Sequence, residues 1–181
     1  MRVEVAAAMS KSSQDFLSIA WPAIGKPFGE IIPVESVTAN SFAKELDTRA
    51  GIDQWLVGVD GNMRGLASRV QWTDSSYDTF TIRVRARFGG PTEYDKRKRE
   101  IAAAGAITPY YVCQAYVSKD RSRLVAAAIA RMRDVIAAMD LGMGGLMPPN
   151  GDGTQGHAVP WAQLRLSGAP LHVWHSQEGL W

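Results

Sequence analysis

Residues 51–88, GIDQWLVGVDGNMRGLASRVQWTDSSYDTFTIRVRARF, contain the patterns that decide the fold class. Two extended segments, residues 53–59 and 64–72, flank Asp60-Gly61-Asn62, and an Asp-Gly pair between extended segments is a strong signal for a β-hairpin. A third segment, residues 79–88, alternates apolar and polar residues along its whole length. This alternation is typical of a strand with one buried face. We therefore expect three consecutive antiparallel strands.

The polar face of this expected meander is basic. Arg83, Arg85 and Arg87 alternate along the third segment, and Arg69 lies on the second. Neighbouring arginines on a strand are costly to bury unless carboxylates or phosphates pair with them. Two interpretations stay open. The four arginines contact the phosphates of a nucleic acid, which guanidinium groups match bidentately, or they form a face that is solvated or paired with carboxylates such as Glu93.

The rest of the chain alternates helical and extended patterns. Helices are expected at residues 39–49, from the N-cap Thr92 to about residue 105, and from Ser118 or Asp120 to about residue 140; strands are expected at residues 109–117, 161–166 and 171–174. Residues 142–156 are rich in glycine and proline and are expected to form a loop. This order predicts a single α/β domain over residues 1–181, in which helices flank a central mixed sheet that contains the three-stranded antiparallel meander.

Composition limits the function classes. At 181 residues, with 46% hydrophobic and 21% charged residues, the chain is long enough for one sizeable core and is not expected to be disordered. The net charge of +2 is too small to indicate a partner by itself. The single cysteine, Cys113, excludes an intramolecular disulfide and a multi-cysteine zinc site, which fits a cytoplasmic protein. No apolar run is long enough to predict a transmembrane helix, so we expect no membrane partner.

Three polar positions in this pattern match a known arrangement. Glu45 lies on the expected helix at residues 39–49, Asp53 stands at the start of the following strand, and Arg69-Val70-Gln71 lies within the next one. The order helix, three antiparallel strands, helix, strand, helix resembles the core of the PD-(D/E)XK nuclease superfamily over about residues 38–140. In that family an aspartate at the start of the second core strand precedes a Glu/Asp-x-Lys motif on the third strand, and a helix before them often adds a glutamate.

The resemblance implies a metal-dependent site. Asp53 and Glu45, with Glu35 as an alternative to Glu45, would hold Mg²⁺, and Gln71 would take the position of the family's lysine. The chain departs from the family at Arg69, which stands where the second metal-binding carboxylate is expected. Mg²⁺ prefers hard oxygen ligands and typically takes one or two carboxylates together with water molecules. Asp53 therefore has two open interpretations, as a metal ligand or as the ion-pair partner of a nearby arginine such as Arg69.

The predicted function is a nucleic-acid-acting protein of this nuclease type. It either cleaves DNA as a metal-dependent endonuclease, with Asp53, Glu45 and Gln71 as its catalytic residues, or is a degenerate member that only binds DNA. The alternative is a protein-interaction or assembly subunit without catalysis. In that case the basic face would contact an acidic protein partner or a second copy of the chain.

Overall fold

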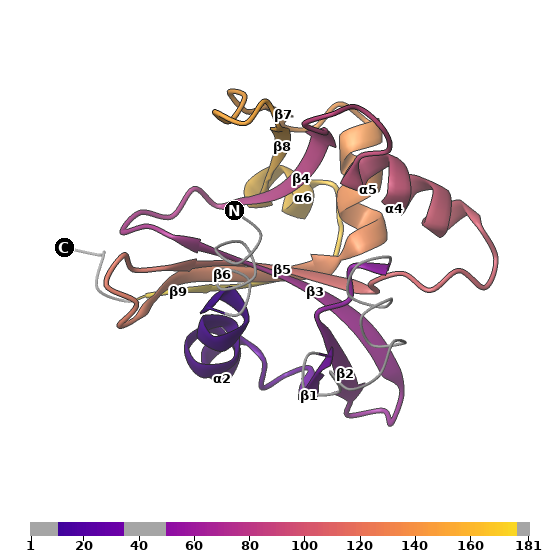
Figure 1. Cartoon of the computed structure of the whole chain (residues 1–181). Helices are drawn as coiled ribbons and strands as arrows, with labels where there is room; N and C mark the ends of the chain where they lie inside the picture. Colours follow the sequence, from indigo (N-terminus) through magenta and orange to yellow (C-terminus); the bar gives the residue numbers. More distant parts are fainter. Residues whose placement is uncertain (1–10, 35–49, 177–181) are drawn as a thin grey trace.

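The computed structural model describes residues 11–34 and 50–176, and its central element is a six-stranded mixed sheet (Figure 1). In spatial order its strands are β1 (Gly29–Pro33), β2 (Gln54–Gly58), β3 (Met63–Trp72), β5 (Tyr111–Val117), β6 (Leu124–Arg131) and β9 (Leu171–His175). The pair β3–β5 is parallel and every other neighbouring pair is antiparallel. The prediction of an α/β fold with a central mixed sheet is therefore confirmed, and so is the hairpin of β2 and β3.

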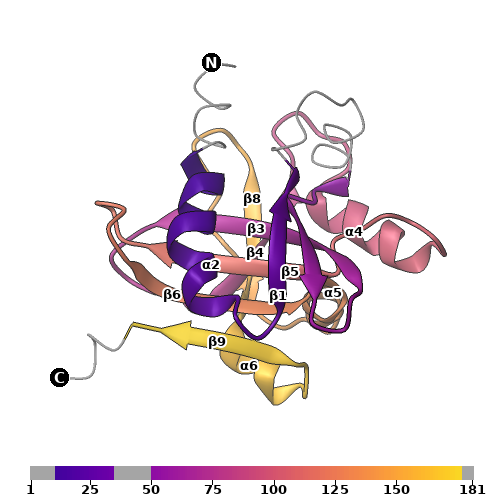
Figure 2. The same cartoon turned by 90° about the horizontal axis from the view of Figure 1, so that it is seen from below.

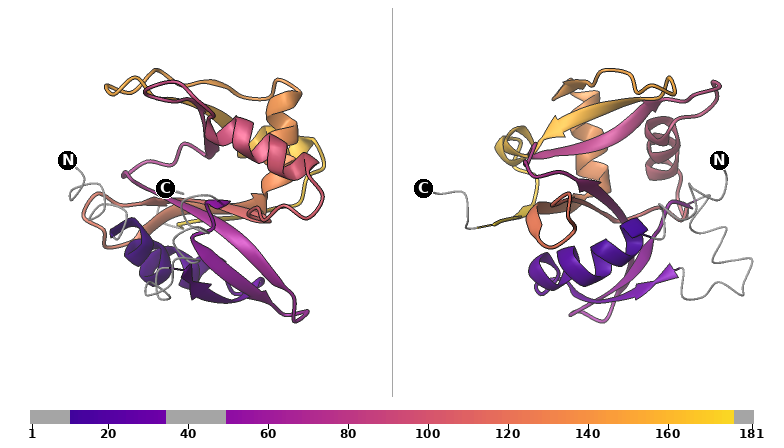
Figure 3. Two further views of the ribbon diagram at one scale, coloured as in Figure 1. Left: turned by 45° about the vertical axis from the view of Figure 1, so that its right-hand side comes forward. Right: turned by 60° about the vertical axis from the view of Figure 1, so that its left-hand side comes forward.

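Two further layers cover this sheet. The lower face carries the π-helical turn η1 (Phe16–Ala20) and helix α2 (Trp21–Ile24), which cross the sheet as Figure 2 shows. The upper layer contains helices α4 (Glu93–Ala102), α5 (Met132–Asp140) and α6 (Trp161–Leu166), together with a second sheet (Figure 3). Separate apolar clusters fill the two spaces. Within the described ranges, no helix is long and apolar enough to cross a membrane.

Strand β4 (Thr79–Arg85) corrects the predicted meander. It does not pair with β3 but with β8 (Gln155–Pro160), which in turn pairs with β7 (Gly145–Leu146) to form the second, three-stranded antiparallel sheet. The alternating pattern of β4 does fix one buried face, because Phe80 and Ile82 lie in the upper core. Such a pattern contains no information about the neighbouring strand, and the free edge of β3 is occupied by β5.

The helix expected from Ser118 or Asp120 to about residue 140 is wrong in its first half. That half forms strand β6, and only the second half, α5, is helical. Leu124, Ala127 and Ile129 pack into the lower core, while Ala126, Ala128 and Ala130 pack into the upper core. A strand buried on both faces has a continuous apolar sequence, which cannot be distinguished from a buried helix by periodicity.

The structure contradicts the strand expected at residues 161–166 and confirms the helix cap expected at Thr92. Residues 161–166 form helix α6 and not the expected strand, since Trp161 and Leu164, three positions apart, are the residues that it buries. Thr92 caps α4 as expected. Its hydroxyl accepts a hydrogen bond from the N–H of Asp95, and Asp95 accepts one from the N–H of Thr92. This capping box fixes the start of α4, which supplies one wall of the site described next.

Candidate functional site

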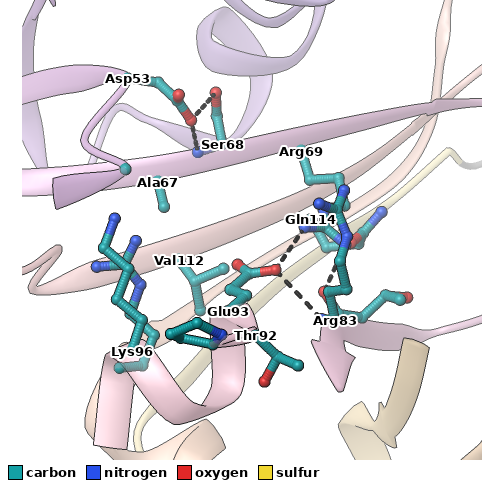
Figure 4. Close-up of a pocket in the computed structure, with 14 residues that line it drawn as sticks. Asp53, Ala67, Ser68, Arg69, Arg83, Thr92, Glu93, Lys96, Val112 and Gln114 are labelled. Atoms are coloured by element: carbon teal, nitrogen blue, oxygen red, sulfur yellow. Dashed lines mark hydrogen bonds and ion pairs between the residues drawn. The ribbon is translucent and has the colours of Figure 1, made fainter. Parts of the chain in front are cut away.

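A pocket of about 540 Å³ lies between the central sheet, β4 and α4 (Figure 4). Its polar lining comes from four elements: Arg69 on β3, Arg83 on β4, Gln114 on β5, and Glu93, Lys96 and Arg97 on α4. With Asp53, four cationic side chains and two carboxylates line the pocket, so it is positively charged overall. Such a site favours an anionic ligand.

Arg69 connects the two sheets. It follows Ala67 on the same face of β3, and Ala67 packs against the upper core. Its guanidinium therefore extends into the upper layer, where Nη1 donates to the carbonyl oxygen of Thr81 on β4 at 2.8 Å. Nη2 lies 2.9 Å from Oε2 of Glu93. Arg69 thus makes one wall of the pocket.

Glu93 is held in its ionised form. Its Oε2 also accepts the backbone N–H of Arg83, at 3.2 Å. Burial raises the pKa of Glu93, but the charges of Arg69 and Arg97 and the Arg83 N–H outweigh this effect and hold the pKa below its usual value. The position in the first turn of α4 adds to this effect, because the helix dipole stabilises negative charge there.

Lys96 and Arg97 bring positive charge from the next part of α4. Burial and the neighbouring Arg97 lower the pKa of Lys96, against the opposing charges of Glu100 and Glu93. Arg97 is 3% exposed, and its Nη1 lies 2.5 Å from Oε2 of Glu100. Gly51 makes room for it: a Cβ at this position, where φ is +61°, would lie 2.2 Å from Nη2 of Arg97.

Gln114 is a buried polar group at the base of the pocket. The residue is 1% exposed, and its Nε2 donates no hydrogen bond within the part of the chain that the structure describes. Buried amides are normally satisfied, so an unused donor in a pocket indicates a ligand or a water molecule as its partner. The sequence contains a signal for it, because Gln114 is the one amide side chain in β5, whose other residues are aliphatic, tyrosine or cysteine.

Asp53 has a structural partner. Its N–H donates to the carbonyl oxygen of Leu66, and its Oδ2 accepts the N–H of Ser68 at 2.6 Å. The Asp53 carboxylate therefore accepts a backbone N–H of β3 just beyond the last residue pair of β2 and β3. In Figure 4, Asp53 lies with Ser68 on one side of β3, and Arg69 extends from the other side towards Glu93. The arginine that pairs with Glu93 is Arg69, so the particular pair Asp53–Arg69 is not formed. The interpretation of Asp53 as the partner of another arginine stays a prediction.

The other predicted site residues divide into three groups. Glu45 and its alternative Glu35 lie outside the described residues. Gln71 lines a second pocket that adjoins the first. Arg85 is exposed on β4 and Arg87 follows it with its guanidinium 4.9 Å from the ring of Phe88, and neither lines the two pockets. Only Arg69 and Arg83 of the four predicted arginines converge, and they do so across two sheets.

The expected metal site does not follow from the described side chains. Within residues 11–34 and 50–176, no three His, Cys, Asp or Glu residues are grouped so that they could hold a metal ion. Asp53 accepts hydrogen bonds from Ser68, and Glu93 accepts them from Arg69 and Arg83. The Mg²⁺ prediction also depended on Glu45, so it stays a prediction, and no chemical step is derived from it.

No protein-family model, curated protein or solved structure matches the chain. Membership of the PD-(D/E)XK superfamily therefore stays a prediction. The function has to be argued from the pocket itself.

Proposed function

We propose that the protein binds nucleic acid by holding backbone phosphate groups between Arg69 and Arg83. The observation that supports this most directly is the convergence of these two side chains, from two different sheets, on one positively charged pocket. Guanidinium groups match phosphate oxygens bidentately, and such charge-assisted hydrogen bonds are about twice as strong as neutral ones.

The pocket arginines could either bind phosphate or be fully paired with carboxylates of the protein. The hydrogen bonds within the pocket favour the first of these roles. Arg69 is bound to Glu93, but the Arg83 guanidinium has no hydrogen bond or ion pair to any residue in the described ranges. Arg83 therefore keeps its donors for a ligand. Arg85 and Arg87 extend the exposed positive charge along the chain beyond the pocket, as a ligand with several phosphates would require.

A binding test follows because the Arg83 guanidinium makes no hydrogen bond or ion pair to the described residues, although, after the hydrogen bonds from Thr154, its charge helps to lower the pKa of Asp152. The Arg83→Gln variant removes this group and leaves the Arg83 N–H bond to Glu93 in place. Fluorescence anisotropy with a labelled oligonucleotide, over a range of NaCl concentrations, measures the dissociation constant. We expect binding to weaken by about tenfold and the salt slope to fall by about one, because one phosphate contact is lost.

The matched control is Arg165→Gln on α6. It removes the same charge from an exposed position that lines neither pocket. If both variants weaken binding equally, net charge explains the result and the pocket is not the binding site. Absence of salt-dependent binding by the wild-type protein would overturn the proposal and favour the assembly subunit, which size-exclusion chromatography with light scattering would detect as a stable oligomer.

Cleavage is the nuclease form of this proposal, in which Asp53, Glu45 and Gln71 form the site that the family resemblance implies. Its test compares the wild-type protein with Asp53→Asn on plasmid and single-stranded DNA, with Mg²⁺ or Mn²⁺ added. Asparagine keeps an oxygen that can accept the Ser68 N–H, so the variant tests the charge more than the fold. Cleavage that is lost in the variant would support an active nuclease, whereas binding without cleavage would support the degenerate form.

A further inference from the structure

A second pocket, of about 290 Å³, adjoins the phosphate pocket and shares Arg69, Thr81 and Arg83 with it. The two arginines therefore stand between two cavities. A phosphate held between them would place the group attached to it in the second cavity. The second pocket has a different chemical character from the first, because the remaining part of its lining contains no charged side chain.

The polar groups of the second pocket are amides. Asn150 donates from Nδ2 to Oγ1 of Thr154, and Gln155 donates from Nε2 to the carbonyl oxygen of Met147, each at 2.8 Å. These bonds fix the two side chains and leave their carbonyl oxygens without a donor among the described residues. Gln71 makes no side-chain hydrogen bond to the described part of the chain. Amide groups of this kind are suited to the donor and acceptor edges of nucleobases.

The remaining walls are apolar and rigid. Met147 and Pro148 provide carbon and sulfur surface beside these amides. The Asn150–Thr154 segment is a closed turn, in which the Asn150 N–H donates to the carbonyl oxygen of Thr154 at 2.8 Å. The loop expected at residues 142–156 is confirmed for this turn, whereas β7 and the first residues of β8 lie within the same range. The turn forms one wall of the pocket. A flat, partly apolar ring with polar edges fits such surroundings.

The depth of the first pocket bears on the form of the nucleic acid. Gln114 is 1% exposed and Arg97 is 3% exposed, and both line it. The backbone of a duplex stays on the outside of a stiff helix and reaches exposed side chains most easily. Donors this deep are accessible to a single strand, whose nucleotides can turn out individually.

We infer that the ligand is a single-stranded nucleic acid, and that one nucleotide places its phosphate between Arg69 and Arg83 and its base in the second pocket against Gln71, Asn150 and Gln155. This inference rests on the proposed function and adds the strand form and a base-binding subsite to it.

The test uses one labelled 12-nucleotide single strand, its duplex with an unlabelled complement, and the four homopolymers of the same length. The variant is Gln71→Ala, which breaks no hydrogen bond to the described residues. The matched control is Gln14→Ala, in the exposed part of the helical segment that precedes η1. We expect single strands to bind at least about tenfold more tightly than the duplex. Gln71→Ala should weaken single-strand binding about fivefold, with an unchanged salt slope and unequal effects on the four homopolymers.

A second variant, Gln114→Met, tests the deep donor. Replacing an unpaired buried amide by an apolar side chain should leave the protein folded. We expect it to weaken single-strand binding about fivefold, because a hydrogen bond to the phosphate is lost.

The outcomes distinguish failure of the single-strand inference from failure of the proposed nucleic-acid binding. Equal affinity for single strand and duplex, or an effect of Gln71→Ala no larger than that of Gln14→Ala, would overturn this inference. Salt-dependent binding that still depends on Arg83 would then leave the proposed function intact. If the wild-type protein binds neither form, the proposed function fails first.

Discussion

Removing the charge of Glu93 should make the protein less stable and its ligand affinity higher. In the Glu93→Gln variant the side chain keeps its size and one carbonyl oxygen for the Arg83 N–H. It loses the ionic attraction to Arg69, whose Nη2 lies 2.9 Å from Oε2. The same change removes a negative charge from the place where a phosphate would bind.

The magnitudes follow from the geometry. Two unit charges about 4 Å apart attract by about 4 kcal/mol at an effective dielectric constant of about 20. Desolvation offsets part of this attraction, and a net charge-assisted hydrogen bond contributes about 1.5–3 kcal/mol. Because the side chains of Arg69 and Glu93 are 38% and 24% exposed, we expect the lower end, about 1.5 kcal/mol. For a chain of this length that lowers the melting temperature by about 3–6 °C.

The binding effect has the opposite sign. A phosphate beside Arg69 and Arg83 lies close to the Glu93 carboxylate in the wild-type protein and is repelled by it. Relief of that repulsion by about 1.4 kcal/mol corresponds to about tenfold tighter binding. Urea denaturation and anisotropy with the same oligonucleotide measure the two effects in one preparation.

The pH dependence gives an independent check. Because the pKa of Glu93 is lowered in the folded protein, its carboxylate stabilises the fold at pH values above the unfolded pKa of about 4.3. This stabilisation is lost as the pH falls through the lower, folded pKa. The difference in stability between the wild-type protein and the variant should therefore be full at pH 7 and decrease at acid pH.

The control for net charge is Asp74→Asn. Asp74 lies on the surface, where its Oδ2 is 3.7 Å from Nζ of Lys119 and its side chain is 56% exposed. Surface pairs of this kind contribute about 0–1 kcal/mol. Weaker binding by Glu93→Gln, or tighter binding by Asp74→Asn to the same extent, would refute the idea that Glu93 and the phosphate compete for the same arginines.

Three further predictions concern stability and reactivity. Asp15→Asn should reduce the free energy of unfolding by about 2 kcal/mol in urea denaturation at pH 7, because the buried carboxylate accepts two 2.7 Å hydrogen bonds from Arg121 that hold its pKa down. This loss of stability should diminish below about pH 4. An unchanged difference between wild type and variant at pH 3 would contradict the role of the ionised Asp15 carboxylate. Thr92→Ala should lower stability by about 1 kcal/mol through loss of the α4 cap, whereas Thr92→Ser should preserve it in the same denaturation assay. Cys113 is fully buried and burial raises its thiol pKa, so a thiol reagent should label it in urea and not in the native state; rapid native labelling would show that the central sheet opens.

The sequence predicted those parts of the fold that depend on local pattern. The β2–β3 hairpin, the cap at Thr92 and the buried strand β5 all follow from turn residues, capping residues or composition within a few positions. The sequence could not predict the neighbour of β4, because an alternating strand shows which face is buried and not which edge it pairs with. It also misled at β6, where alanines satisfied the helical and the extended pattern equally.

The candidate site was only partly accessible from the sequence for the same reason. The alternating pattern predicts Arg69 and Arg83 on the basic face of one sheet. They do meet, but across two sheets. The sequence indicates Glu93 only as a partner of arginines, and Lys96 only as a residue of the helix expected after Thr92. Their places in the pocket depend on where α4 lies over the central sheet, which no local pattern encodes. Gln114 was the one missed residue with a visible signal.

The parallel pairing of β3 with β5 has a consequence for how the candidate site forms during folding. Parallel neighbours require a crossover connection, and here that connection, residues 73–110, contains β4 and α4. Apart from Gly51 and Asp53, every residue that lines the first pocket lies on β3, on this crossover or on β5. A chain that ends before residue 111 would therefore contain all of the charged groups of the pocket and no assembled site. During synthesis, the candidate site cannot form until β5 has emerged and docked beside β3.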